Sequence, residues 1–190
     1  MASYTIRKGR IEDCEALFEL AMKLRVHTGD AVFGGPVTTE EMLREDGFGP
    51  KPRYRFYLAI YSPPENGPQT IEKAVGFVGL SDMFCPLSGR TSYLTGLFVD
   101  VEHRGNHLGV ALMKAVAQDC VKQRSSRLSF AVDTNDLDTR KFYAAVGATN
   151  LTESTTPNEY WRFFEPNMKK LATGDELKSS SGKTIAFKTD

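Results

Sequence analysis

The run from Tyr93 to Leu112 constrains the fold of this chain more than any other segment. A β-patterned stretch ends at Val101, and a short turn at 104–109, Arg-Gly-Asn-His-Leu-Gly, leads directly into an amphipathic helix. The start of a helix has backbone N–H groups without intrahelical partners and the positive end of the helix dipole. Glycine in such a turn lets a phosphate approach the backbone closely. The segment therefore predicts a strand–turn–helix unit with a phosphate-binding site at its turn.

Hydrophobic periodicity on both sides of this unit predicts a mixed α/β (α+β) fold. We expect strands at 4–7, 54–61, 74–80, 91–101, 127–132, 149–153 and 159–164, and helices at 11–27, 38–47, 107–122 and 136–146. A capping box from Thr38 to Glu41 should open the second helix. The strand–helix–strand run at 91–132 should form a right-handed parallel crossover. This order predicts a mixed, mostly antiparallel sheet with helices on both faces.

The length of 190 residues fits a single domain, which we expect to span 1–173. The segment 174–190 is rich in Lys, Ser and Gly and has little apolar surface to bury, so we expect a flexible C-terminal tail.

Charge and cysteine content exclude several classes of partner. The 24 basic and 24 acidic residues leave no basic excess, so we expect neither a nucleic acid nor a membrane surface as partner. The three cysteines have no CxxC spacing, and we expect no metal site and no disulfide framework. No segment has the length and apolarity of a membrane span or a signal peptide, so we expect a cytoplasmic protein.

The turn at 104–109 resembles the R-x-x-G-x-G/A pyrophosphate loop of the GNAT superfamily of acetyl-CoA-dependent N-acetyltransferases. The resemblance implies acetyl-CoA as cosubstrate, with no metal, and the predicted order of elements matches the GNAT fold. It also implies that the loop backbone binds the pyrophosphate, through Arg104, Gly105, Asn106, His107, Leu108 and Gly109. His107 stands where the superfamily usually has glycine, and we expect it to adopt an α conformation in the first helical turn.

The resemblance extends to the strand that precedes this turn. In GNAT proteins the fourth and fifth strands splay apart, and the acetyl-pantetheine arm inserts between them. By resemblance, Leu97, Phe98 and Val99 would supply backbone contacts to that arm. One of their N–H groups would polarise the thioester carbonyl, as an oxyanion hole does.

A third segment, Asn135 together with Lys141 to Ala148, resembles the superfamily's N-…-F-Y-…-G-A region. The resemblance implies that Tyr143 is the catalytic acid that protonates the leaving thiolate. It also implies a cofactor contact from the Asn135 amide, although Asp136 occupies the position with the usual spacing to the tyrosine.

Within the superfamily, the chain is most similar to the diamine (spermidine/spermine) and thialysine N-acetyltransferase group. The segment Met42 to Gly49 matches that group's leucine-rich E-D-G-F-G sequence. The group has adjacent carboxylates in its fourth strand, and Thr95 and Gly96 occupy those places here. The group's acidic and tryptophan hairpin positions fall on Cys85 and Leu87. These departures disfavour a polyamine acceptor, because a polycation would lack carboxylate partners.

The general base is left open by the sequence. The groups that could start a proton-carrying water chain are Asp82, Asp100, Glu102, His103 and Asp133. Simple strand alternation places Asp100 on the face opposite Thr95, which ranks Asp82 and Asp133 above it.

Two functions follow from these observations. The first is acetyl-CoA-dependent N-acetylation of a primary amine on a small molecule, of diamine or lysine-analogue type, by direct transfer. The alternative is a non-catalytic acyl-CoA-binding sensor or regulatory subunit on the same fold. By resemblance a homodimer is expected, with Trp161 to Phe164 near the surface where the two copies pair.

Overall fold

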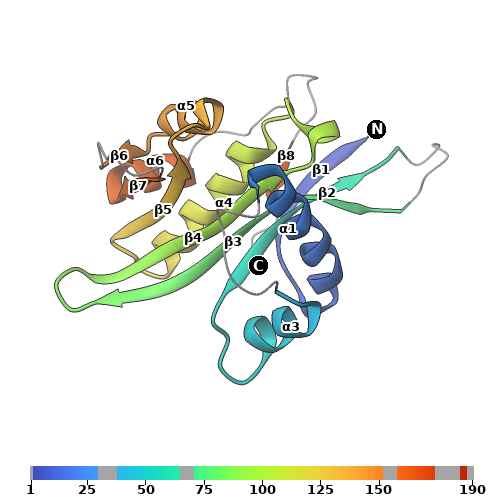
Figure 1. Cartoon of the computed structure of the whole chain (residues 1–190), viewed down its shortest axis with the longest axis horizontal. Coiled ribbons are helices and arrows are strands. Elements are labelled where there is room, and N and C mark those ends of the chain that lie inside the picture. Colours follow the sequence, from blue (N-terminus) through green and yellow to red (C-terminus); the bar gives the residue numbers. More distant parts are fainter. Residues whose placement is uncertain (1, 30–37, 65–70, 152–157, 174–184, 188–190) are drawn as a thin grey trace.

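A single eight-stranded sheet organises the described residues, which in this computed structural model are 2–29, 38–64, 71–151, 158–173 and 185–187 (Figure 1). The strand order is β6-β7-β5-β4-β3-β2-β1-β8. Only the β4–β5 and β1–β8 pairs are parallel, and the other described pairs are antiparallel. The strand bounds are Ser3–Lys8 (β1), Arg55–Ser62 (β2), Lys73–Cys85 (β3), Gly89–Val99 (β4), Arg127–Asp133 (β5), Thr149–Asn150 (β6), Asn158–Phe164 (β7) and Ile185–Phe187 (β8).

Helices cover both faces of this sheet, as the resemblance implies. Their bounds are Cys14–Thr28 (α1), Glu40–Phe48 (α3), Leu108–Lys122 (α4), Leu137–Ala145 (α5) and Glu165–Thr173 (α6), with 3₁₀ turns at Ile11–Asp13 (η1) and Val101–His103 (η2). On one face α1 packs against β2, β3 and β4, where Leu17, Leu20, Phe56, Phe77 and Phe98 form one apolar cluster.

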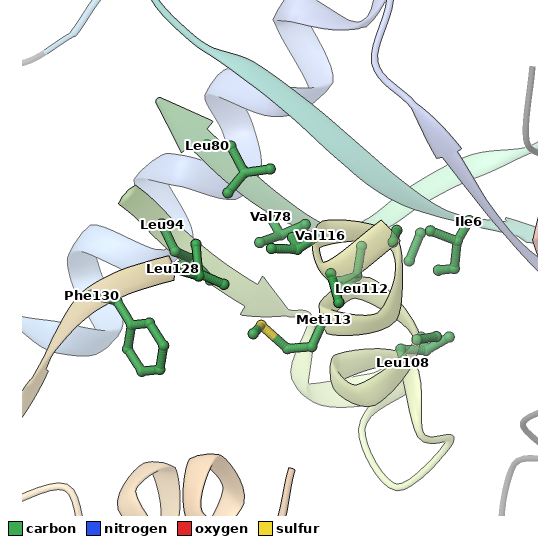
Figure 2. Packing of buried hydrophobic residues seen from close by; sticks show 14 of the residues in the cluster. Ile6, Val78, Leu80, Leu94, Leu108, Leu112, Met113, Val116, Leu128 and Phe130 are labelled. Carbon is green, nitrogen blue, oxygen red and sulfur yellow. The ribbon is translucent and has the colours of Figure 1, made fainter. Parts of the chain in front are cut away.

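The other face is covered by α4, which is apolar around most of its circumference because it packs against both the sheet and α6. Leu108, Leu112, Met113 and Val116 are fully buried there and belong to one cluster with sheet residues such as Val78 and Leu128 (Figure 2). Burying one such side chain contributes about 1.5–3 kcal/mol. This packing fixes the position of the helix start at Leu108, and with it the 104–109 turn.

Most predicted elements are present, with a few differences. The cap of α3 is Thr39, whose hydroxyl accepts the N–H of Met42, and not Thr38 as predicted. Helix α6 was not predicted. Strand β8 lies inside the expected tail 174–190, because residues 185–187 pair with β1; the rest of that segment lies outside the described residues.

Candidate functional site

A gap between β4 and β5 is the central feature of the site. The two strands pair at Ser92↔Leu128 and Tyr93↔Ser129, whereas β4 continues to Val99 and β5 to Asp133. The described ladder therefore ends near the middle of both strands, which confirms that the fourth and fifth strands splay apart. Backbone groups on the β5 side of β4 can then bind an extended ligand as a strand edge binds a peptide.

A β-bulge in β4 accompanies this separation. Leu80 of β3 pairs with Leu94, but Gly79 pairs with Gly96, so Thr95 is the extra residue. A bulge bends the strand and shifts its side-chain alternation by one position. Beyond the bulge, Leu97 and Phe98 pair with β3 through Val78 and Phe77, so that edge of β4 is occupied and the opposite edge borders the gap.

The side chains of the three predicted pantetheine contacts pack against the apolar clusters, with Phe98 buried and Leu97 and Val99 half-buried. Phe98 is buried in the α1-face cluster, while Leu97 and Val99 pack against the α4-face cluster. Their side chains are therefore committed to packing, which leaves the backbone as the part of this segment that can contact a ligand.

The 104–109 turn follows directly and is braced by its own side chains. Arg104 Nε donates to the Val99 carbonyl at 3.1 Å. Asn106 Nδ2 donates to the carbonyl oxygens of His103, at 3.1 Å, and Arg104, at 3.2 Å. Gly105 and His107 both have positive φ, of 75° and 56°. Left-handed residues alternating with others form a concave array of backbone N–H groups that suits an anion.

The conformation expected for His107 was wrong. His107 is the cap residue just before α4, in the left-handed region at φ 56° and ψ 17°, and not a right-handed residue of the first helical turn. This is the backbone conformation that glycine adopts without steric penalty. The chain thus keeps a glycine-like backbone at a position where a histidine stands, and the imidazole is exposed.

Leu108 and Gly109 fix the start of α4 in two ways. The Leu108 side chain is buried in the core. A Cβ at Gly109 would lie 3.2 Å from the Phe142 ring, so the glycine allows α5 to pack closely over the helix start.

Tyr143 is carried by α5 and lies beside β5. Its side chain is 5 % exposed, and its ring centroid is 4.3 Å from that of Phe130 and 5.1 Å from that of Phe142. Burial, and secondarily the charge of Asp136, raise the pKa of the Tyr143 phenol. Because burial disfavours the phenolate, the hydroxyl remains a proton donor well above neutral pH.

Asn135 lies at the exposed turn between β5 and α5. Its backbone N–H donates to Asp133 Oδ1 at 2.8 Å. The cap of α5 is Asp136, whose carboxylate accepts the Thr139 N–H at 2.9 Å. Desolvation opposes ionisation of Asp136, but the hydrogen bonds from Thr139 and the charges of His27 and Arg104 lower its pKa overall. The cofactor contact of Asn135 stays a prediction.

The carboxylates considered as bases are engaged elsewhere. Asp82 accepts two hydrogen bonds from Arg55, at 2.8 and 2.9 Å, and Arg55 also contacts Asp119 of α4. Asp82 therefore faces the α4 side of the sheet. Asp133 accepts the backbone N–H of Asn135.

Asp100 forms an ion pair with Lys23 of α1 at 2.5 Å. The expectation that Asp100 faces away from Thr95 was wrong. Both residues contact the α1 side, because the bulge at Thr95 changes the alternation along β4. Hydrogen bonding and charge from Lys23 lower the pKa of Asp100, so this carboxylate is a weak base.

The histidine nearest the turn is also engaged. His103 Nδ1 lies 3.1 Å from the Tyr4 hydroxyl, and the His103 ring packs against Tyr61 with centroids 5.0 Å apart. Glu102 is exposed.

A cavity of about 510 Å³ opens between α1, α3 and the sheet, and we call it the α1–α3 cavity. Its sheet side is lined by Gly79, Ser81, Thr95 and Gly96. The sequence singled out two of these four residues. The sequence gave no individual role to the residues of the apolar walls or to the three charged lining residues. The lining includes Leu17, Ala21, Leu24, Arg25, Met42, Leu43, Asp46, Arg53, Tyr54, Phe56 and Phe77. The matched segment Met42 to Gly49 was the signal that α3 belongs to the site.

A second cavity, of about 420 Å³, lies between the C-terminal part of α1 and the end of β4. It is lined by Met22, Lys23, Val26, His27, Phe98, Asp100 and Val101. His27 is exposed, with its ring centroid 6.4 Å from that of Phe98.

Comparison with known proteins identifies the family to which this arrangement belongs. The model of the acetyltransferase (GNAT) family matches residues 31–148, which is more than half of the chain. The chain belongs to the GNAT acetyltransferase family.

Two curated relatives of this GNAT acetyltransferase bear the same name. The chain is 31% identical over 178 residues to the thialysine N-epsilon-acetyltransferase of Bos taurus, and the match covers 90% of this chain and 99% of that protein. It is 28% identical over 172 residues to the protein of the same name from Sus scrofa, with the same coverage of both chains. The relatives are thus matched over nearly their full length.

Solved structures share the fold of this acetyltransferase. The PaiA N-acetyltransferase of Thermoplasma acidophilum, crystallised in complex with coenzyme A, superimposes with a TM-score of 0.62 at 17% identity. That match covers 85% of this chain and 99% of the other. A probable acetyltransferase from Staphylococcus epidermidis gives a TM-score of 0.63 at 16% identity, covering 86% of this chain and 99% of that one.

Two features are absent from the described residues of this acetyltransferase. No helix there is both long and apolar enough to cross a bilayer. No group of three or more His, Cys, Asp or Glu residues in the same part of the chain is arranged to hold a metal ion.

Proposed function

We propose that this enzyme transfers the acetyl group of acetyl-CoA directly to a primary amine of a small molecule, of diamine or lysine-analogue type. The observation that carries the proposal is the meeting of two sites at one strand. The 104–109 turn and the β4–β5 gap border one end of β4, and the α1–α3 cavity reaches the same strand at the Thr95 bulge. A donor in the gap and an acceptor in the cavity would then react across β4.

The cofactor would be held mainly by backbone groups. The positive φ at Gly105 and His107 and the start of α4 at Leu108 support pyrophosphate binding by the N–H groups of 104–109. The gap beside Leu97, Phe98 and Val99 supports insertion of the pantetheine arm. The names of the bovine and porcine relatives, and the coenzyme A in the Thermoplasma structure, agree with this assignment.

The chemistry is addition followed by elimination. The neutral amine attacks the thioester carbonyl, a C–N bond forms, and a strand N–H at 97–99 stabilises the oxyanion. As the intermediate collapses the nitrogen gives up a proton to water, the C–S bond breaks, and the Tyr143 phenol donates its proton to the leaving thiolate. The raised pKa of Tyr143 keeps that proton in place at neutral pH. The phenolate regains a proton from solvent.

Deprotonation of the acceptor falls to water in this proposal. An alkylammonium of pKa about 10.4 must lose a proton before it attacks, which costs about 4.6 kcal/mol at pH 7. Asp82 and Asp100 are both engaged in ion pairs, with Arg55 and Lys23. A water chain through the α1–α3 cavity, whose sheet side has the Ser81 and Thr95 hydroxyls, would take up the proton.

The test is release of free thiol from acetyl-CoA with a panel of spermidine, putrescine, lysine, thialysine and a lysine peptide. One clearly preferred small amine is expected. A preference for the peptide would contradict a small-molecule acceptor. A flat panel together with tight CoA binding would support the acyl-CoA sensor instead.

We also propose a homodimer. In this chain β7 lies between β5 and β6, so pairing through the last strands would use the part of β7 beyond the short β6. Sedimentation equilibrium at micromolar concentration tests this, and a monomer mass would contradict it.

A further inference from the structure

We infer that the tip of the β3–β4 hairpin, together with the connection from α4 to β5, docks on the surface of an anionic lipid membrane. We call this surface the hairpin surface. Its apolar members are Met83, Phe84 and Leu87, and its cations are Arg90, Lys122, Arg124 and Arg127. It adjoins the start of β4 at Gly89, whereas the 104–109 turn follows the other end of that strand. The inference therefore goes beyond acetyl transfer and does not depend on it.

The hairpin projects beyond the rest of the sheet. Pairing of β2 with β3 ends at Arg55↔Leu80, and pairing of β5 with β4 begins at Ser92↔Leu128. Within the described part of the chain, the β-ladder beyond these points joins only the two arms of the hairpin. Figure 1 shows this hairpin extending past the neighbouring strands, beside the connection that leads from α4 into β5. Its tip can thus reach a flat surface before the rest of the sheet does.

The tip of the hairpin exposes large apolar side chains. Leu87 is 97 % exposed, Phe84 72 % and Met83 54 %. A single exposed apolar residue is normal on a protein surface, but apolar residues gathered on one projection indicate a binding surface. Side chains in this position can enter an apolar phase without any rearrangement of the core.

Cations lie next to these apolar side chains. Arg90 is exposed and is opposite Phe84 in the hairpin register. The connection from α4 to β5 is fastened to the hairpin by Ser126. Its backbone N–H donates to the Arg90 carbonyl at 2.9 Å, and its hydroxyl donates to the Ser88 carbonyl at 3.1 Å. This connection brings three further cations to the hairpin: the exposed Lys122 and Arg124 and the half-buried Arg127.

The positive charges of the hairpin surface are not neutralised by ion pairs. Among the residues that the structure describes, no acidic side chain forms an ion pair with any of the four cations. Asp82 and Asp119, which precede the two segments, both pair with Arg55. The 24 basic and 24 acidic residues cancel over the whole chain, and the expectation of no membrane partner rested on that total. The local distribution favours an anionic partner at this end of the molecule.

The combination of side chains suits a lipid surface better than a nucleic acid. Binding to an anionic membrane combines burial of apolar side chains at the boundary of the acyl chains with attraction of Lys and Arg to the headgroups. Nucleic acids without base pairing are instead bound by aromatic rings that stack on bases. The hairpin surface has one aromatic ring, Phe84, and its most exposed apolar side chain is the aliphatic Leu87.

The experiment is co-sedimentation of the full chain with lipid vesicles. Vesicles of phosphatidylcholine alone are compared with vesicles of phosphatidylcholine and phosphatidylserine, at low and at physiological salt. We expect binding to the anionic vesicles only, and weaker binding at the higher salt concentration, because salt screens the attraction between cations and headgroups.

A matched pair of variants locates the contact. Leu87→Ser with Arg90→Gln removes one exposed apolar side chain and one cation from the hairpin surface. Binding to anionic vesicles should fall by about tenfold or more, since one cation alone accounts for about fivefold. Ile71→Ser with Lys73→Gln is the control, because Ile71 is 83 % exposed and Lys73 is exposed, and Lys73 begins the other end of β3. This control should bind as the unmodified chain does.

A fluorescence measurement tests entry of the tip into the bilayer. In Phe84→Trp, tryptophan emission should shift to shorter wavelength when anionic vesicles are added. In Ile71→Trp, which carries the same Trp161 background, it should not shift. Melting temperatures equal to that of the unmodified chain confirm that each variant is folded.

Three results would overturn the inference. Equal binding to neutral and anionic vesicles would exclude recognition through the cations. Unchanged binding of the variant at Leu87 and Arg90 would exclude the hairpin surface as the point of contact. Binding of a single-stranded RNA oligonucleotide that is lost in this variant, with no binding of either vesicle, would assign the surface to nucleic acid.

Discussion

The 104–109 turn and the α1–α3 cavity stand at opposite sides of β4 and differ in how they can recognise a ligand. In the turn the proposed binding groups are backbone N–H groups, shaped by the positive φ of Gly105 and His107. In the cavity they are side chains, and Arg25, Asp46 and Arg53 come from three separate segments. The turn therefore tolerates a histidine in place of glycine, provided the backbone keeps its shape. In the cavity, we expect a single replaced side chain to change which acceptor fits.

The largest effect is expected at Tyr143, which is the general acid of the proposed mechanism. Tyr143→Phe should lower kcat by about 10²–10⁴ through loss of the general acid. The affinity for CoA should remain, because the Phe ring still packs against Phe130. Steady-state thiol release and calorimetric CoA binding measure the two quantities. An unchanged kcat would remove Tyr143 from the mechanism.

The pH dependence of kcat/KM separates deprotonation of the acceptor amine from proton donation by Tyr143. The kcat/KM for an amine of pKa about 10.4 should rise about tenfold per pH unit between pH 7 and 9, as the neutral amine becomes more abundant. Burial raises the pKa of Tyr143, and a group with a raised pKa stays protonated through this range. No alkaline decline should therefore appear below pH 10. A bell-shaped profile with its descending limb below pH 9 would contradict a buried tyrosine as the acid.

The acceptor preference of the α1–α3 cavity should change when a single negative charge is added to its lining. Thr95→Asp places a carboxylate on the sheet side, where the diamine acetyltransferase group has one by resemblance. We expect the kcat/KM for putrescine to increase about tenfold relative to thialysine, which corresponds to about 1.4 kcal/mol. Thr95→Asn, of the same size but uncharged, is the control and should leave the ratio unchanged. An equal increase in both variants would mean that shape, and not charge, sets the preference.

The smallest effect is expected in the 104–109 turn, where the comparison predicts that a changed side chain at His107 is tolerated. His107→Gly should raise the free energy of unfolding by about 0.5–1 kcal/mol, because relief of the left-handed strain exceeds the added entropy of the unfolded chain. His107→Ala keeps the Cβ and should give no gain. Urea unfolding measures both. The affinity for CoA should change less than about twofold; for scale, a tenfold change corresponds to about 1.4 kcal/mol. A larger loss would show that the imidazole itself contacts phosphate.

The sequence predicted the parts of the site that depend on local pattern. The strand, turn and helix from β4 to α4 follow from apolar periodicity and glycine spacing, and the splay of β4 and β5 follows from the family resemblance. The sequence placed Asp100 on the wrong face of the sheet, because the alternation of side chains along a strand gives no sign of a bulge at Thr95. It missed β8, because the three residues 185–187 become a strand only through pairing with β1.

What the sequence determined by itself is the family and the position of the cofactor turn, since both are encoded in contiguous residues whose backbone preferences act locally. Only the tertiary structure determined which side chains lie together on the acceptor side of the site. The sequence ranked Asp82 above Asp100 as a base, but Arg55 and Lys23, from other elements, form ion pairs with both carboxylates. The α1–α3 cavity likewise exists only where helices and strands distant in sequence pack together, because the charge that a ligand meets depends on which side chains share one space.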